Sequence, residues 1–174
     1  MGLTAKHLNQ YVGKNIKDIC EFGFTSDEAL HCAHFVSHVL NFRKGALCGS
    51  RKGKAPSGVC TSVQTILDAV PWFREFDQEQ DLQHSMCLIF VAPLKNATGN
   101  QISGHRHVGF FANGAVWHYE NETDKVITHS LFPSAPGKRF ADRYKKKEGE
   151  CGLWIGGVPS TGSTGDKISG PVFA

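Results

Sequence analysis

The sequence lacks a long apolar run, a secretory leader and a strong excess of charge of either sign. No apolar stretch among its 174 residues is long enough to cross a bilayer. The segment 1–11 has no apolar core of the kind that secretory signals carry. We therefore expect no membrane contact, and either a cytoplasmic protein or one exported by a route that needs no cleavable signal. The net charge of +3 does not argue for a nucleic-acid partner, and none is expected.

Closely spaced cysteine pairs are also missing. None of the 6 cysteines belongs to a C-x-x-C pair, which argues against a zinc ribbon and against a thioredoxin-like site. Cys87 lies in the apolar run 86–91 and is expected to be a small buried hydrophobe. Cys48 and Cys60 flank a loop rich in glycine and lysine. They could form a disulfide in an oxidising compartment or remain reduced.

The order of the predicted elements indicates a single domain of the α+β class over residues 1–174. Helical spacing of apolar residues predicts helices over 3–20, from the capping residues 25–28 to about residue 42, and over 61–70. The pattern then changes and predicts strands over 86–91, 105–112, 115–121, 126–131 and 151–158. This order favours N-terminal helices packed on a C-terminal antiparallel sheet. Residues 160–174 are expected to form a loose tail.

Cys32 lies at the start of the second predicted helix. On a helical wheel it shares one face with Phe35, Val36 and Val39, so this face is expected to pack on the rest of the protein. A thiol in the first turn of a helix experiences the positive end of the helix dipole, which lowers its pKa and favours the thiolate. The sequence therefore predicts a nucleophile at Cys32. The alternative is that Cys32 is one more buried core cysteine.

A stripe of histidines lies on another face of the same predicted helix. His34 and His38 are four residues apart, and His31 is near them. This spacing could bind zinc. No H-E-x-x-H pattern and no cysteine pair supports such a site, so solvated or hydrogen-bonded histidines are the favoured interpretation. No metal is expected.

The strongest hairpin signal is Asn113-Gly114, between two alternating segments. A two-residue turn there places His107 and His118 on one face of the hairpin as diagonal neighbours, within side-chain reach of each other. Gly109, opposite His118, leaves space for a ring to lean toward His107. Such a pair can serve as a base and its orienting group, or it can be two polar residues on a solvated face. His105 shares this face and is a weaker candidate base.

These two signals together resemble the NlpC-type papain-like cysteine peptidases and their CHAP relatives. In that family a cysteine opens a helix, a strand carries a His-Val-Gly-aromatic segment, and a third polar residue, often histidine, follows on the next strand. Cys32, the segment 107–111 and His118 match these features in order and in strand phase. The resemblance covers roughly residues 26–131. The chain departs from the family's pattern at His31, where aspartate or asparagine is common.

The resemblance implies a papain-like fold and an amidase or endopeptidase that cuts the peptide stems of peptidoglycan. It assigns Cys32 as the nucleophile, His107 as general base and then general acid, and His118 as the group that orients His107. The backbone N–H of Cys32 would help to hold the oxyanion. Neither a metal nor a cofactor is implied. Because cell wall lies outside the cytoplasm, the resemblance further implies a phage lysin, or a toxin injected by a system such as type VI secretion with an immunity protein as partner.

Two other functions remain open at this point. The segment 31–36 is similar to the cysteine motif of lipid acyltransferases and thioesterases of the lecithin:retinol acyltransferase type, although in those proteins the histidine strand precedes the cysteine. Alternatively, a basic loop could make the protein a non-catalytic module that binds an anionic polymer. A solvated loop is the default interpretation there, as it is for the basic cluster 143–147. The loop contains Arg43, Lys44, Arg51, Lys52 and Lys54.

Overall fold

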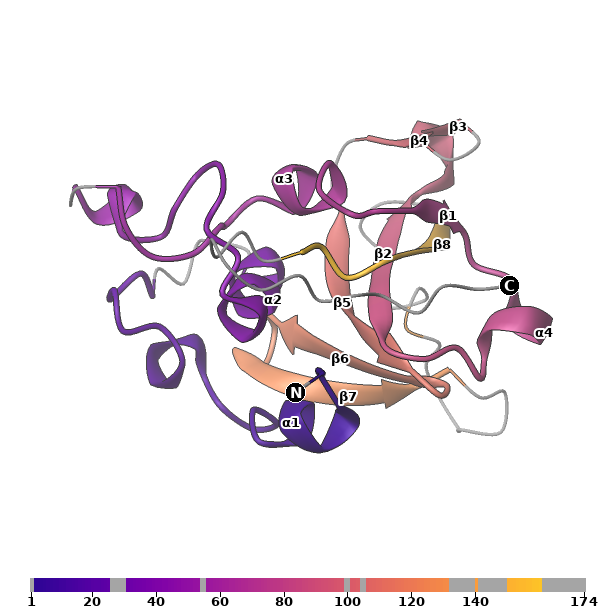
Figure 1. The fold of residues 1–174 in the computed structure, drawn as a ribbon, viewed down its shortest axis with the longest axis horizontal. Helices are drawn as coiled ribbons and strands as arrows, with labels where there is room; N and C mark the ends of the chain where they lie inside the picture. The colour runs from indigo at the N-terminus through magenta and orange to yellow at the C-terminus, as the bar shows by residue number, and fades with distance from the viewer. Residues whose placement is uncertain are drawn as a thin grey trace.

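A computed structural model describes residues 2–25, 31–53, 56–98, 101–103, 106–131, 140 and 150–160. Short helices dominate the first half of the chain and strands the second (Figure 1). The helices are α1 (Ala5–Asn9), η1 (Ile16–Asp18), α2 (Cys32–Leu40), η2 (Ser50–Lys52), α3 (Val63–Leu67), α4 (Gln78–Asp81) and η3 (Leu94–Asn96). The strands are β1 (Phe73–Glu75), β2 (Cys87–Pro93), β3 (Ala97–Thr98), β4 (Gln101–Ile102), β5 (His107–Ala112), β6 (Ala115–Glu120), β7 (Lys125–Ser130) and β8 (Cys151–Gly156). Within this part of the chain, no helix combines the length and the apolar character that a bilayer crossing requires.

Six strands form one antiparallel sheet in the order β1-β8-β2-β5-β6-β7, and β3 pairs with β4 separately. The hairpin β5–β6 turns at Asn113 and Gly114, whose φ angles of 49° and 74° are both positive, as a two-residue turn of this kind requires. Ala112 pairs with Ala115 across the turn, which confirms the predicted register. The prediction of an α+β protein built on an antiparallel sheet is therefore confirmed.

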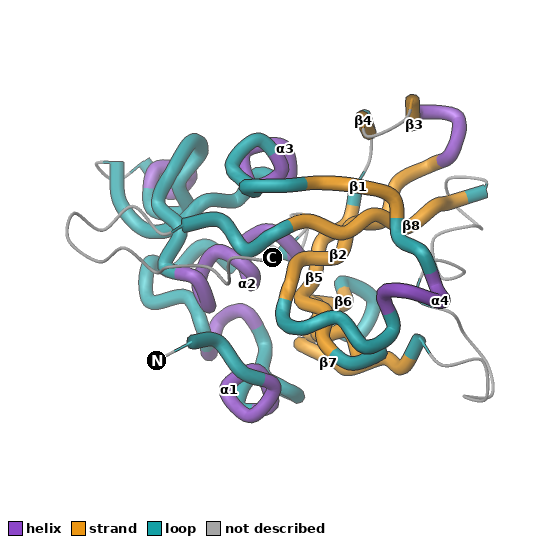
Figure 2. Tube along the Cα trace, turned by 45° about the vertical axis from the view of Figure 1, so that its right-hand side comes forward, coloured by secondary structure: helices purple, strands orange, loops and turns teal. Residues whose placement is uncertain are grey.

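The two faces of the sheet are covered differently. Figure 2 shows α1, α2 and α3 with their loops on one side of the strands and α4 on the other. Helix α2 contacts β5 and β6, and Phe35 of the helix packs edge-on against Phe110 of β5 in the larger core. The opposite face of the central strands carries a smaller core that includes Phe111 and Phe140. Both faces of β5 are therefore buried.

The helices are shorter than the sequence predicted. The helix expected over 3–20 is divided into α1 and η1, and Gly13 between them has a φ angle of +84°, which a helix cannot contain. Helix α2 ends at Asn41, which adopts the left-handed conformation that commonly terminates helices. Ser62 caps α3 by accepting a hydrogen bond from the Thr65 N–H at 3.2 Å. The predicted capping residues 26–28, the basic cluster 143–147 and the tail after residue 160 lie outside the described residues.

Candidate functional site

Cys32 is the first residue of α2 and is 1% exposed. The start of the helix is held against the end of β6, because the backbone N–H of His31 donates to Asn121 Oδ1 at 3.1 Å. Phe35 and Val36, one turn further along, are fully buried in the core between α2 and the sheet. The predicted packing face of the helix is thus confirmed, and it places the thiol of Cys32 at the boundary between helix and sheet.

Burial raises the pKa of the Cys32 thiol above its ordinary value. The nearby backbone N–H groups of Val108, Ala33 and Cys32 itself act in the opposite direction but do not prevail. The sequence predicted a lowered pKa from the helix dipole, and this prediction is wrong in its net direction. A helix N-terminus typically stabilises a charge by about 0.3–1 kcal/mol, whereas removing an ion from water costs several kcal/mol. The thiol is consequently neutral at rest.

His107 and His118 form a buried pair on β5 and β6. The Nε2 atom of His107 lies 2.9 Å from Nδ1 of His118, and the rings meet edge to face. The two residues are 5% and 0% exposed, so the alternative of a solvated polar face is excluded. A Cβ atom added at Gly109 would lie 3.0 Å from the Cβ of His118, so the glycine provides the predicted space. The predicted juxtaposition is confirmed; His105 lies outside the described residues.

Aromatic rings enclose the imidazole pair. The ring of His129 on β7 stacks on His118 with centroids 5.1 Å apart. Phe140 packs against the rings of His107 and His118 at centroid distances of 5.6 Å and 4.8 Å. Neither His129 nor Phe140 was singled out by the sequence, because their approach depends on the pairing of β6 with β7 and on a loop contact. Water is thereby kept from much of the pair.

The thiol of Cys32 and the ring of His107 approach the start of β5 from different sides. The backbone N–H of Val108 acts to lower the pKa of the Cys32 thiol. Cys32 therefore borders the peptide group that joins His107 to Val108. Strand N–H groups lie in the plane of the sheet, while the side chain of His107 projects from the face that carries Phe111. Among the described residues, no hydrogen bond joins the sulfur atom to the ring. Cys32 therefore lies beside the backbone of His107, and the two histidines lie beside each other.

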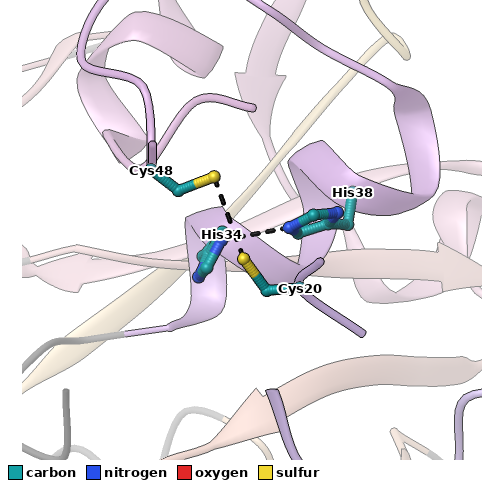
Figure 3. A group of neighbouring side chains, drawn as sticks. All are labelled: Cys20, His34, His38 and Cys48. Carbon is teal, nitrogen blue, oxygen red and sulfur yellow. Dashed lines mark hydrogen bonds between the residues drawn. The ribbon is translucent and has the colours of Figure 1, made fainter. Parts of the chain in front are cut away.

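A second group of reactive side chains lies on another side of α2 (Figure 3). The ligand atoms of Cys20, His34, His38 and Cys48 all lie within 4.8 Å of one another. Cys20 follows η1, both histidines belong to α2, and Cys48 belongs to the loop after this helix. The two sulfur atoms are 3.9 Å apart, and the Nε2 atoms of the two histidines are 3.1 Å apart. These side-chain types are those that bind zinc in proteins.

The surroundings of this cluster keep its histidines neutral. Burial, assisted by the nearby His38, lowers the pKa of His34 to about 3. Burial and the charge of Arg43 lower the pKa of His38 to about 4. Burial also raises the pKa of the Cys48 thiol. The spacing of His34 and His38 indicated a possible zinc pair, although the sequence favoured a role without metal. The sequence did not indicate Cys20 and Cys48, because their positions depend on how two loops fold over α2.

The possible disulfide between Cys48 and Cys60 is not formed, and both residues are free thiols. The two segments do pair, since Leu47 and Cys60 form an isolated bridge. However, the Cys48 sulfur faces Cys20, whereas the Cys60 thiol donates to the Ser62 carbonyl oxygen at 3.6 Å. The pairing of the backbone therefore turns the two sulfur atoms toward different partners.

The basic loop is partly ordered by contacts within the protein. Arg43 Nε donates to Asn41 Oδ1 at 2.8 Å, and Arg51 Nε donates to Thr61 Oγ1 at 2.9 Å. Arg51 also lies over the ring of Phe24 at 5.7 Å. The side chain of Lys52 and the whole of Lys54 are outside the described residues. The contacts of these two arginines do not single out an anionic ligand.

No protein-family model, curated protein or solved structure matches this chain. The resemblance to NlpC-type enzymes consequently depends on Cys32 and on the histidine hairpin alone.

Proposed function

We propose that the protein is a cysteine hydrolase that cuts amide bonds, with Cys32 as the nucleophile and His107 and His118 as its proton-transfer pair. The observation that supports this most is the buried 2.9 Å contact between two imidazoles at the strand position that borders the Cys32 thiol. A nucleophile, a base and an orienting group in sequence order are the parts that acyl transfer needs. The helix start at Cys32 adds backbone N–H groups beside the reacting sulfur.

The proposed reaction begins from a neutral thiol. As the sulfur atom attacks the amide carbonyl carbon, His107 Nδ1 accepts the thiol proton. His107 then delivers this proton to the leaving nitrogen, the C–N bond breaks, and a thioester forms on Cys32. Water, deprotonated by the same imidazole, hydrolyses the thioester to a carboxylate and regenerates the thiol. Because the thiol and the His107 ring approach the start of β5 from different sides, this proton transfer requires the two groups to come together when substrate binds, as catalytic hydrogen bonds often do.

His118 has a positioning role in this scheme. Because Nε2 of His107 contacts His118, the proposed scheme assigns the reaction with the thiol to Nδ1. For Nδ1 to carry a lone pair, the proton of neutral His107 must reside on Nε2 and be donated to Nδ1 of His118. A second contact of His118 Nδ1, to the Tyr119 carbonyl oxygen at 3.3 Å, favours the opposite tautomer. The shorter contact is the one that the reaction uses.

The substrate class in this proposal is the peptide stem of bacterial cell wall, on the strength of the resemblance to NlpC-type enzymes. Action as an injected toxin, with an immunity protein as inhibitor, belongs to the same proposal. A bound inhibitor of this kind would cover the surface above Cys32. None of the proposed steps requires a metal ion or an organic cofactor.

The first experiment compares purified full-length variants on purified peptidoglycan, with released fragments identified by mass spectrometry. We expect the wild-type protein to release stem-peptide fragments, and Cys32→Ala to reduce the rate by at least ~10³-fold. Cys60→Ala is the matched control, because Cys60 is equally buried and its thiol is hydrogen-bonded to the Ser62 backbone, away from His107 and His118. Equal release by the wild type and Cys32→Ala would remove the nucleophile assignment, and no release by a folded wild type would remove the substrate class.

A further inference from the structure

We propose that Cys20, His34, His38 and Cys48 bind one zinc ion, which fixes α2 to the two loops that cover it. This inference does not depend on the proposed hydrolase activity, because none of the four residues takes part in that reaction. It depends on the positions of four side chains that come from three separate segments of the chain.

The distances within the cluster fit a tetrahedral ion. Zinc bonds of about 2.3 Å to sulfur and about 2.0 Å to nitrogen place neighbouring ligand atoms roughly 3.3–3.8 Å apart. The sulfur atoms of Cys20 and Cys48 are 3.9 Å apart, and the Nε2 atoms of His34 and His38 are 3.1 Å apart. A disulfide would require a separation of about 2.05 Å. Every other pair of ligand atoms lies within 4.8 Å, so small shifts of the side chains would bring all four onto one zinc ion.

The donor set and its burial indicate a structural ion. Cys20, His34 and Cys48 are buried and His38 is partly buried. Two thiolates and two neutral imidazoles complete a four-coordinate shell and leave no position for a water molecule or a substrate. On binding, the two thiols release two protons to solvent, and the two thiolates balance the charge of Zn²⁺. A neutral complex of this kind is compatible with the burial of the ligands.

Neighbouring groups hold the ligands in the orientation that the ion requires. The other ring nitrogen of His34, Nδ1, lies 3.1 Å from Nδ1 of His31, so its Nε2 atom faces the cluster. The backbone N–H of Val59 donates to the Cys48 sulfur at 3.4 Å, which supports a thiolate. A Cβ atom at Gly58 would lie 2.4 Å from the same sulfur, and the φ angle there is +88°. Only glycine therefore allows the 57–59 segment to approach Cys48 so closely.

The ion would connect helix α2 to two loop segments that are not joined to it by regular secondary structure. Cys20 closes the segment that contains η1, and Cys48 begins the turn that leads to η2. The histidines lie on the stripe of α2 that faces away from the sheet, whereas Cys32 and Phe35 face the sheet. Zinc on one side and the apolar core on the other would hold α2 in place, and with it the first residue of the helix.

The test measures metal in the full-length protein, purified without chelator from zinc-supplemented medium. We expect about one zinc ion per chain in the wild type, and loss of nearly all of it in Cys20→Ser and in Cys48→Ser. Cys60→Ala is again the matched control and should keep the metal. Cys32→Ala should also keep it, so that loss of the proposed nucleophile and loss of the proposed metal site are distinguished by different variants.

Cobalt provides a test that does not depend on how well the serine variants fold. Zinc is removed from the wild type with a chelator, and Co²⁺ is added to the full chain. We expect the intense d–d absorption of tetrahedral Co²⁺ together with a thiolate-to-metal charge-transfer band. Cys20→His keeps a four-ligand shell and should bind Co²⁺ with about half of that charge-transfer intensity. A wild type with no zinc and no such bands, an unchanged spectrum in Cys20→His, or a Cys20–Cys48 disulfide in freshly purified protein would each overturn the proposal.

Discussion

At the scale of single residues, the contact between His107 and His118 determines which nitrogen atoms can move a proton. Two imidazole nitrogens 2.9 Å apart share one hydrogen, so one ring must donate and the other accept. Both rings are buried and enclosed by Phe140, which makes rearrangement of the pair costly. A substitution at His118 should therefore alter which ring nitrogen of His107 carries the proton, without moving the His107 backbone.

We expect His118→Ala to reduce kcat by about 10²-fold with little change in KM, because the substrate does not contact His118 in the proposed reaction. The pH at which activity rises should also move, since His107 loses the neighbour that fixes its tautomer. His118→Asn, which retains a hydrogen-bonding group at the same position, should recover part of kcat. The measurement is a pH profile of the rate of fragment release for all three proteins.

A purely structural role for His118 makes a different prediction. In that case His118→Ala would lower the melting temperature, and the activity of the remaining folded protein would keep the wild-type pH profile. Thermal unfolding of each variant, recorded alongside the rates, separates the two outcomes.

At the scale of the elements, the hairpin β5–β6 depends on Gly109. This residue allows the two strands and the His118 side chain to pack closely, since an added Cβ would lie 2.7 Å from the Trp117 carbonyl oxygen and 3.0 Å from the His118 Cβ. Backbone atoms on the neighbouring strand cannot withdraw as a flexible side chain would. The hairpin must therefore separate locally to admit a methyl group.

We expect Gly109→Ala to lower the free energy of unfolding by about 1–3 kcal/mol, as overpacking of a buried site typically does. Activity should fall as well, because His118 would be displaced from His107. Gly2→Ala is the matched control, since nothing lies within 4 Å of the added methyl group there. Urea unfolding monitored by tryptophan fluorescence provides the measurement. Equal stability of both variants would show that the hairpin adapts without cost.

The same hairpin was predictable from sequence because its determinants are local. Asn113 and Gly114 both tolerate positive φ angles, and the alternation of apolar residues on either side fixes which face enters the core. The face of α2 that contains Phe35 and Val36 was predictable for the same reason. In both cases neighbours within a few positions of the chain decide the structure.

Long-range contacts account for what the sequence did not predict. The sequence indicated β8 as a strand, but its place between β1 and β2 results from pairing with segments about 60–80 residues earlier. Cys20 and Cys48 give no local signal, because each reaches His34 only after its own loop has folded over α2. The direction of the Cys32 pKa was missed because it depends on burial by the whole fold rather than on the first turn of the helix.

At the scale of the whole molecule, a polar network attaches the N-terminal segment to the sheet. The Asp124 carboxylate, in the turn between β6 and β7, accepts hydrogen bonds from the Tyr119 hydroxyl and from the Asn15 side chain. The Tyr119 oxygen in turn accepts the Ile16 N–H at 3.0 Å. The Tyr119 hydrogen bond, followed by that of Asn15 and the nearby charges of His31 and Lys17, holds the pKa of Asp124 below its ordinary value.

We expect this network to make part of the stability depend on ionised Asp124. Because the pKa of Asp124 is lowered in the folded state, its contribution is fully present above the ordinary aspartate pKa of about 3.9 and is lost as the pH falls through the folded-state value. Asp124→Asn should therefore be less stable than the wild type near neutral pH, and the difference should shrink in acid. Asparagine also tolerates the positive φ angle of 51° at this position, so the substitution mainly removes the charge.

The measurement is the free energy of unfolding in urea at a series of pH values between about 7 and about 2, for the wild type, Asp124→Asn and the exposed control Asp68→Asn. A stability difference that stays constant over this range would mean that the Asp124 carboxylate binds its partners equally well when protonated. A difference that closes only for Asp124→Asn would identify this carboxylate as the charge that joins the N-terminal segment to β6 and β7. In acid the Tyr119 hydroxyl should lose the charged acceptor that orients it toward the Ile16 N–H, while the backbone hydrogen bonds of Gly13 and Lys14 with Val126 keep the segment beside β7.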